Sequence, residues 1–106
     1  MSLVKSFTAN GVLEGKQNIV FGISVSSFVN PASPPPPSGP LLITIRDDAA
    51  VSGSGRILAR FVLTQEGGSD SVIFPAGVRC TNGVAITITN SSPETHGDIV
   101  VVIDYS

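Results

Sequence analysis

The chain has 106 residues, a formal net charge of −2, one cysteine and only 13% charged residues, which is roughly half the charged fraction of an ordinary soluble domain. This length predicts one domain, residues 1–106, and the single cysteine excludes an internal disulfide. Six scattered Lys and Arg residues predict no nucleic-acid partner, and the longest apolar run, 99–103, is too short to cross a membrane.

An alternation of apolar and other residues with a period of two runs through most of the chain. It indicates strands, because successive side chains of a strand point to opposite faces. The apolar positions are rich in Val and Ile, and no stretch of eleven residues keeps a helical period. We therefore predict an all-β fold with strands near 3–9, 12–15, 18–28, 41–46, 56–65, 71–74, 78–81, 84–90 and 98–105.

The phase of the alternation predicts which side chains face the core. In the 18–28 strand it selects Ile19, Phe21, Ile23 and Val25, and in the 56–65 strand it selects the odd-numbered residues from Ile57 to Leu63. Of the six aromatic residues, this phase leaves two as exposed platforms. These are Phe28 and Tyr105.

Turn residues punctuate the strands at the spacing expected of a β-sandwich or barrel. About eight strands in a chain of this length predict two packed antiparallel sheets in a single-domain, jelly-roll-like β-sandwich. The predicted turns are Asn10-Gly11, Asp47-Asp48, 53–55, 66–69, 75–77, Asn82-Gly83 and 91–97.

A proline-rich excursion at 30–40 interrupts this pattern, with six prolines in eleven positions. Each proline fixes φ and removes a backbone donor, so the segment is not an interior strand. Two interpretations stay open, a surface loop between sheets and an arm that reaches a neighbouring subunit. The arm would use the stiff polyproline run of Pro34, Pro35, Pro36 and Pro37 as its interaction residues.

The sequence contains few residues suited to catalysis. Cys80 lies at an apolar-compatible position beside a tight turn, where a free thiol acts as a small hydrophobe. A cluster of Glu94, His96 and Asp98 allows an ion site but is also typical of a polar loop. Asp47-Asp48 allows half of a calcium site but follows a strand, as turn residues do. We predict no catalytic residues, no cofactor, no metal and no enzymatic activity.

The low charge density has two interpretations. Either a Ser- and Thr-rich face is exposed to solvent, or part of the surface is covered by copies of the chain or by a partner.

Residues 75–86, PAGVRCTNGVAI, follow the pattern Pro-x-Gly-φ-x-φ-x-Asn-Gly-φ-x-φ, in which φ is apolar, and a short loop and a final strand ending at Tyr105 follow them. This third of the chain resembles small β-sandwich virion proteins of tailed bacteriophages. The resemblance implies a head-decoration (cement) protein that forms a homotrimer, binds the major capsid protein and lies on the capsid surface after synthesis in the host cytoplasm. The shared positions are turn and core residues, so no functional residue is carried over. The alternative is a fibre-tip, adhesin or carbohydrate-binding module.

Overall fold

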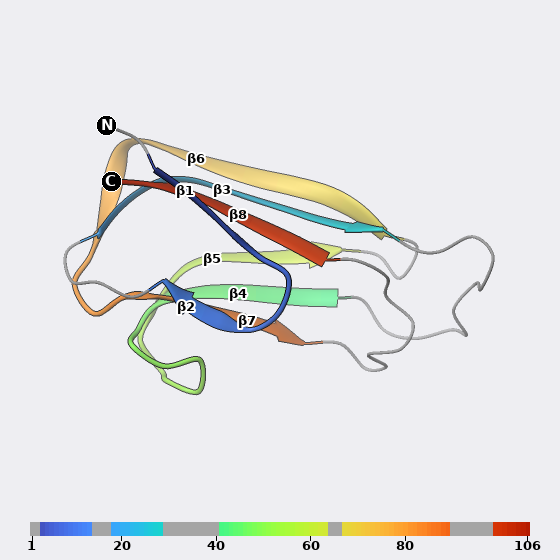
Figure 1. Ribbon diagram of the computed structural model, residues 1–106, viewed down its shortest axis with the longest axis horizontal. Helices are drawn as coiled ribbons and strands as arrows, with labels where there is room; N and C mark the ends of the chain where they lie inside the picture. Colours follow the sequence, from blue (N-terminus) through green and yellow to red (C-terminus); the bar gives the residue numbers. More distant parts are fainter. Residues whose placement is uncertain (1–2, 14–17, 29–40, 64–66, 90–98) are drawn as a thin grey trace.

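The computed structural model describes residues 3–13, 18–28, 41–63, 67–89 and 99–106 (Figure 1). Within these ranges every regular element is a strand, so the all-β prediction is confirmed, and none of them contains a helix that could cross a membrane. The strands are β1 (Leu3–Phe7), β2 (Gly11–Leu13), β3 (Asn18–Phe28), β4 (Leu41–Asp47), β5 (Arg56–Leu63), β6 (Gly67–Cys80), β7 (Val84–Thr89) and β8 (Ile99–Tyr105).

The eight strands form two antiparallel four-stranded sheets, sheet A in the order β1-β8-β3-β6 and sheet B in the order β2-β7-β4-β5. The chain folds as one long antiparallel double ribbon made of four successive strand pairs, β1·β8, β2·β7, β3·β6 and β4·β5. Successive pairs lie in opposite sheets. This is the strand order of a jelly roll, which confirms the predicted fold class. Figure 1 shows sheet A as the upper layer and sheet B as the lower one.

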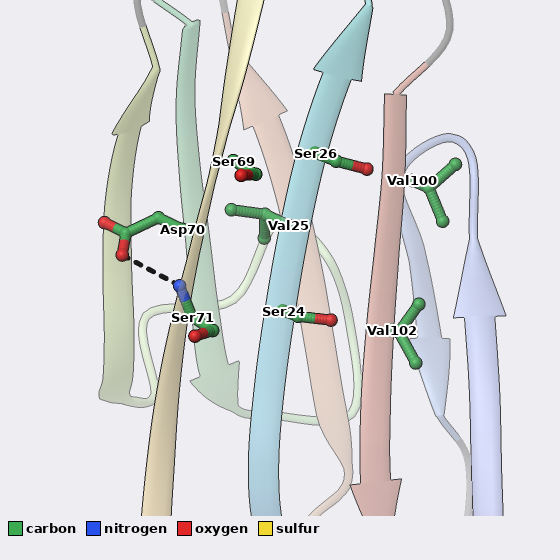
Figure 2. A pocket seen from close by; sticks show the side chains of 8 residues that line it. All are labelled: Ser24, Val25, Ser26, Ser69, Asp70, Ser71, Val100 and Val102. Carbon is green, nitrogen blue, oxygen red and sulfur yellow. Dashed lines mark hydrogen bonds between the residues drawn. The ribbon is translucent and has the colours of Figure 1, made fainter.

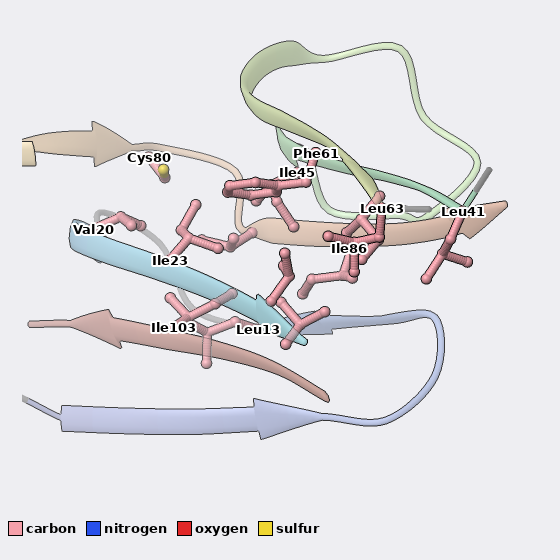
Figure 3. Packing of buried hydrophobic residues seen from close by; sticks show 14 residues of the cluster. Leu13, Val20, Ile23, Leu41, Ile45, Phe61, Leu63, Cys80, Ile86 and Ile103 are labelled. Carbon is pink, nitrogen blue, oxygen red and sulfur yellow. The ribbon is translucent and has the colours of Figure 1, made fainter. Parts of the chain in front are cut away.

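The core lies between the inner faces of the two sheets (Figure 3). Burial of a Val, Leu or Ile side chain stabilises the fold by about 1.5–3 kcal/mol, and β4 alone buries three such side chains. The buried apolar residues are Leu13, Val20, Ile23, Val25, Leu41, Ile43, Ile45, Phe61, Leu63, Cys80, Val84, Ala85, Ile86, Val101 and Ile103.

A β-bulge in β3 changes the phase of its alternation. Val20 pairs with Tyr105 and Gly22 with Asp104, so Phe21 is an extra residue opposite β8. The prediction that Ile19 and Phe21 face the core is therefore wrong, because both are partly exposed while Val20 is fully buried. Beyond the bulge, Ile23 and Val25 are buried as predicted.

A second bulge has the same effect in β5. Ile45 pairs with Ala59 and Arg46 with Ile57, which leaves Leu58 as the extra residue. Leu58 packs against the core, whereas the side chain of Ile57, predicted to be buried, is 44% exposed. The rest of β5 keeps the predicted phase.

The two predicted strands 71–74 and 78–81 are parts of one strand, β6, and the predicted turn at 75–77 is an irregularity within it. The pairing with β3 jumps from Ile73 to Val78, and Gly77 has a φ of 77°. Because β6 is the edge strand of sheet A, the missing N–H of Pro75 costs no interior ladder hydrogen bond.

Candidate functional site

The residues predicted to form an interaction arm, Pro34, Pro35, Pro36 and Pro37, lie outside the described residues. The same holds for Glu94, His96 and Asp98, which allow an ion site but are also typical of a polar loop. Within the described part of the chain, no group of three or more His, Cys, Asp or Glu side chains is arranged to hold a metal ion.

Cys80 is fully buried at the end of β6 and belongs to the core (Figure 3). Its Sγ lies 3.9 Å from the carbonyl oxygen of Val78, its weak hydrogen-bond acceptor. Burial, assisted by the negative charge of Asp47, raises the pKa of the thiol to about 11. A thiol with such a pKa is a poor nucleophile at neutral pH, which agrees with its predicted role as a small buried hydrophobe.

Asp47 and Asp48 use their carboxylates to hold backbone segments together. Asp47 accepts hydrogen bonds from the N–H groups of Thr81 at 3.2 Å and Asn82 at 2.9 Å, at the β6–β7 turn. Asp48 accepts hydrogen bonds from the N–H groups of Ala50 at 3.0 Å and Gly55 at 2.8 Å, across its own loop. The two carboxylates therefore bind separate turns. The predicted turn at Asp47-Asp48 begins one residue later than expected, because Asp47 is the last residue of β4.

The outer face of sheet A is the most distinctive surface among the described residues. We call it the serine face, because hydroxyl side chains line its centre (Figure 2). The pairing registers place its residues in three rows across the strands. The rows are Val4, Asp104, Gly22 and Ile73; Ser6, Val102, Ser24 and Ser71; and Val100, Ser26 and Ser69.

The small side chains of the serine face leave it hollowed. Two adjoining open hollows, with volumes of about 510 Å³ and about 260 Å³, share Ser24, Ser71 and Val102 in their walls. In Figure 2 the serines of β3 lie between the serines of β6 and the valines of β8, and Asp70 lies at the outer edge of β6. The face thus combines hydroxyl groups with short aliphatic side chains over a broad area.

Asp104 is the only charged residue within the three rows. One of its carboxylate oxygens, Oδ1, is covered from solvent and has no hydrogen-bond partner among the described residues. A covered acceptor without a donor is costly, by about 1–3 kcal/mol, and more for a charged group. Because atoms of the chain itself cover this oxygen, the cost falls on the fold, and the oxygen is not open to an external donor.

Large apolar side chains are exposed at both edges of sheet A. On β1, the side chain of Leu3 is 48% exposed and that of Val4 is 65% exposed, and on β6 that of Ile73 is 75% exposed. Val4 and Ile73 are the two ends of one row of the serine face. Exposed apolar residues around a charge-poor sheet are typical of a surface that a protein partner covers.

The serine face was not predicted. The alternation places Ser24 and Ser26 on the polar side of their strand, but it does not show that β3 and β6 pair and bring these serines beside Ser71 and Ser69. The only signal was the repeated hydroxyl residue at alternate positions in both segments.

Comparison of the chain with protein-family models, with curated protein sequences and with solved structures found no match.

Proposed function

We propose that the protein is a structural component of a virion, a decoration (cement) protein that binds a bacteriophage head as a homotrimer and stabilises its shell. The serine face is the observation that carries this proposal. It is the surface that meets the major capsid protein, and the edges of sheet A join the copies to one another.

The chemistry of the serine face suits close packing against another protein. Ser and Val side chains lose little rotamer entropy when they are covered, in contrast to Lys, Arg or Glu. A face with a single charged residue also loses little hydration when water leaves it.

The jelly roll is compatible with a stabilising role, but the fold alone does not distinguish this role from sugar binding. Its two sheets and shared core form a rigid platform, and viral capsid proteins and lectins both use this fold. Sugar-binding sites usually stack rings on exposed aromatic side chains, whereas Tyr105 is partly buried against the core. The serine-face rows contain no aromatic residue, so a carbohydrate-binding module ranks second.

Co-sedimentation with expanded phage heads tests the proposal. The heads are assembled from the major capsid protein of the phage whose genome encodes this chain. We expect saturable binding and an increased resistance of the heads to heating. Ser24→Arg places a long charged side chain in the centre of the serine face and should abolish binding.

The matched control is Thr89→Arg, which adds the same side chain at an exposed position of β7 in sheet B and should preserve binding. Wild-type protein that fails to bind expanded heads would contradict the proposal. Specific, sugar-competable binding to a glycan array would favour the carbohydrate-binding alternative instead.

A further inference from the structure

We propose that copies of the chain join head to tail, with β1 of one copy pairing antiparallel to β6 of the next, so that sheet A continues from subunit to subunit. This inference rests on the homo-oligomeric function proposed above and specifies the contact between its copies. The occupant of each edge of sheet A is therefore a second copy of the same chain.

Both strands lie at the ends of sheet A, in the order β1-β8-β3-β6. β1 buries almost nothing within its own subunit, because four of its five residues are exposed and only Phe7 is partly buried. It is held mainly by its backbone ladder with β8. An edge strand with exposed apolar side chains is a template for strand addition by another chain.

The direction of the backbone groups at the two edges can be deduced from one hydrogen bond. The N–H of Ser71 donates to the carboxylate of Asp70 at 2.8 Å, and Figure 2 shows this bond on the side of β6 away from β3. The N–H and C=O groups of one residue in an antiparallel sheet point to the same side, and successive residues alternate. The odd-numbered residues 69 and 71 of β6 therefore present their backbone groups to the free edge.

The same alternation can be followed across sheet A. Ser71 lies opposite Ser24, Ser24 opposite Val102, and Val102 opposite Ser6. Because the backbone groups of Ser71 point away from β3, those of Ser24 point to β8 and those of Val102 point back to β3. The backbone groups of Ser6, and of Val4 two residues before it, are then directed to the free edge of β1.

These directions restrict the register between copies. Val4 or Ser6 must lie opposite an odd-numbered residue of β6, which allows Val4 opposite Ser71 and excludes Val4 opposite Val72. With Val4 opposite Ser71, Lys5 lies opposite Asp70. The Ser71 N–H then exchanges its bond to the Asp70 carboxylate for one to the carbonyl oxygen of Val4, which leaves that carboxylate for Lys5. Lys5 is the only charged residue of β1, and Asp70 is the only one between 67 and 74.

The same register places Leu3 opposite Val72, which adds an apolar pair on the same side of the sheet as the Lys5–Asp70 pair. A shift by two residues, with Val4 opposite Ile73, also satisfies the backbone, but it leaves both charges opposite apolar residues. Charge complementarity between the two edges therefore selects the first register, and Pro75 limits the pairing beyond it.

The contact uses different surfaces of the two copies, so it is heterologous and can close into a ring such as a trimer. Because sheet A runs on through each contact, the serine faces of neighbouring copies become one continuous surface.

Disulfide trapping tests the register. The double variant Val4→Cys with Ser71→Cys carries its two new thiols at opposite edges of sheet A, so they can only bond between copies. Native Cys80 is buried and does not compete. We expect oxidation to give covalent dimers and closed multimers, whereas each single variant stays uncrosslinked. Efficient crosslinking of either single variant would reveal a symmetric contact and overturn the inference.

Charge reversal provides a second measurement that does not depend on oxidation. Lys5→Glu and Asp70→Lys should each weaken association several-fold, and the double variant should restore it, because every contact then contains one of each charge. The control Arg60→Glu makes the same change of charge as Lys5→Glu, at an exposed position of β5, and should leave association unchanged.

The results of these experiments distinguish the proposed homo-oligomeric function from the proposed head-to-tail contact. Wild-type protein that is monomeric at micromolar concentration contradicts both of them. A stable oligomer that neither crosslinks through positions 4 and 71 nor responds to charge reversal contradicts only the head-to-tail contact.

Discussion

The carboxylate of Asp47 accepts a hydrogen bond from the backbone N–H of Asn82, 2.9 Å away and 35 residues later in the chain. A second bond from Thr81 and an ion pair with Arg56 at 3.9 Å involve the same carboxylate. The end of β4 in sheet B is thereby joined to the β6–β7 turn, where the chain passes from sheet A to sheet B. One buried acidic side chain thus connects the two layers at this end of the sandwich.

Asp47→Ala should destabilise the protein by about 2–4 kcal/mol, because two backbone donors lose a charged acceptor in a largely buried place. Urea unfolding at a fixed protein concentration measures this loss. Arg56→Ala is the matched comparison: the Arg56 side chain is 59% exposed, so its removal should cost about 1 kcal/mol or less. Equal losses in the two variants would show that the ion pair, and not the backbone bonds, stabilises this corner.

Gly83→Ala should also destabilise the fold, by about 1–3 kcal/mol. Gly83 has a φ of 142°, and a Cβ atom there would lie 2.8 Å from the carbonyl oxygen of Asp48. Gly22→Ala is the control, because the nearest atom to its Cβ is a carbonyl oxygen at an ordinary 3.5 Å. We expect the control to change the free energy of unfolding by about 0.5 kcal/mol or less. A stable Gly83→Ala variant would mean that the β6–β7 turn adapts to a side chain.

The stability of the 48–55 loop should depend on pH through Asp48. Hydrogen bonds from the backbone N–H groups of Ala50 and Gly55 hold the pKa of Asp48 below its ordinary value of 3.8. The unfolded chain therefore binds a proton first as the pH falls. The contribution of Asp48 to stability is complete above pH 3.8 and is lost as the pH falls through the lowered value in the folded state.

Asp48→Asn removes this titration while keeping an oxygen acceptor. Its unfolding free energy should decline less steeply than that of the wild type below about pH 4. Urea unfolding at a series of pH values gives both curves, and parallel curves would contradict the role assigned to Asp48.

The Cys80 thiol should be unreactive in the folded protein. With a pKa of about 11, its thiolate fraction at pH 8 is about a hundredfold lower than that of a thiol with the ordinary value of 9.0. Burial reduces access further. Reaction with a chromogenic disulfide reagent should be slow in buffer and fast in denaturant, and fast reaction without denaturant would contradict the buried environment of Cys80.

The alternation of apolar residues predicted the strands and the sandwich because period-two patterning directly reflects one buried face. The errors come from bulges. An extra residue such as Phe21 or Leu58 reverses the phase of the alternation within a strand. The sequence does not reveal this reversal, because apolar residues occupy both faces of the strand near the bulge. Pro75 and Gly77 suggested a turn because they break interior strands, but β6 lies at an edge and tolerates them.

The serine face depends on which strands pair over long sequence distances, and the alternation of apolar residues carries no information about that pairing. Ser24 and Ser71 become neighbours only because β3 and β6 pair with each other. By contrast, the buried position of Cys80 and the turn role of Asp48 follow from local sequence, and these were predicted. The role of Asp47 was not predicted, because it ends β4 and its hydrogen-bond donors lie 34 and 35 residues later in the chain.

The assembly of identical copies is the central claim, and the mass of the wild-type protein in solution tests it most directly. Sedimentation equilibrium at micromolar concentration should give three times the chain mass of 10.9 kDa. A single species at the mass of one chain, unchanged as the concentration rises, would contradict the account.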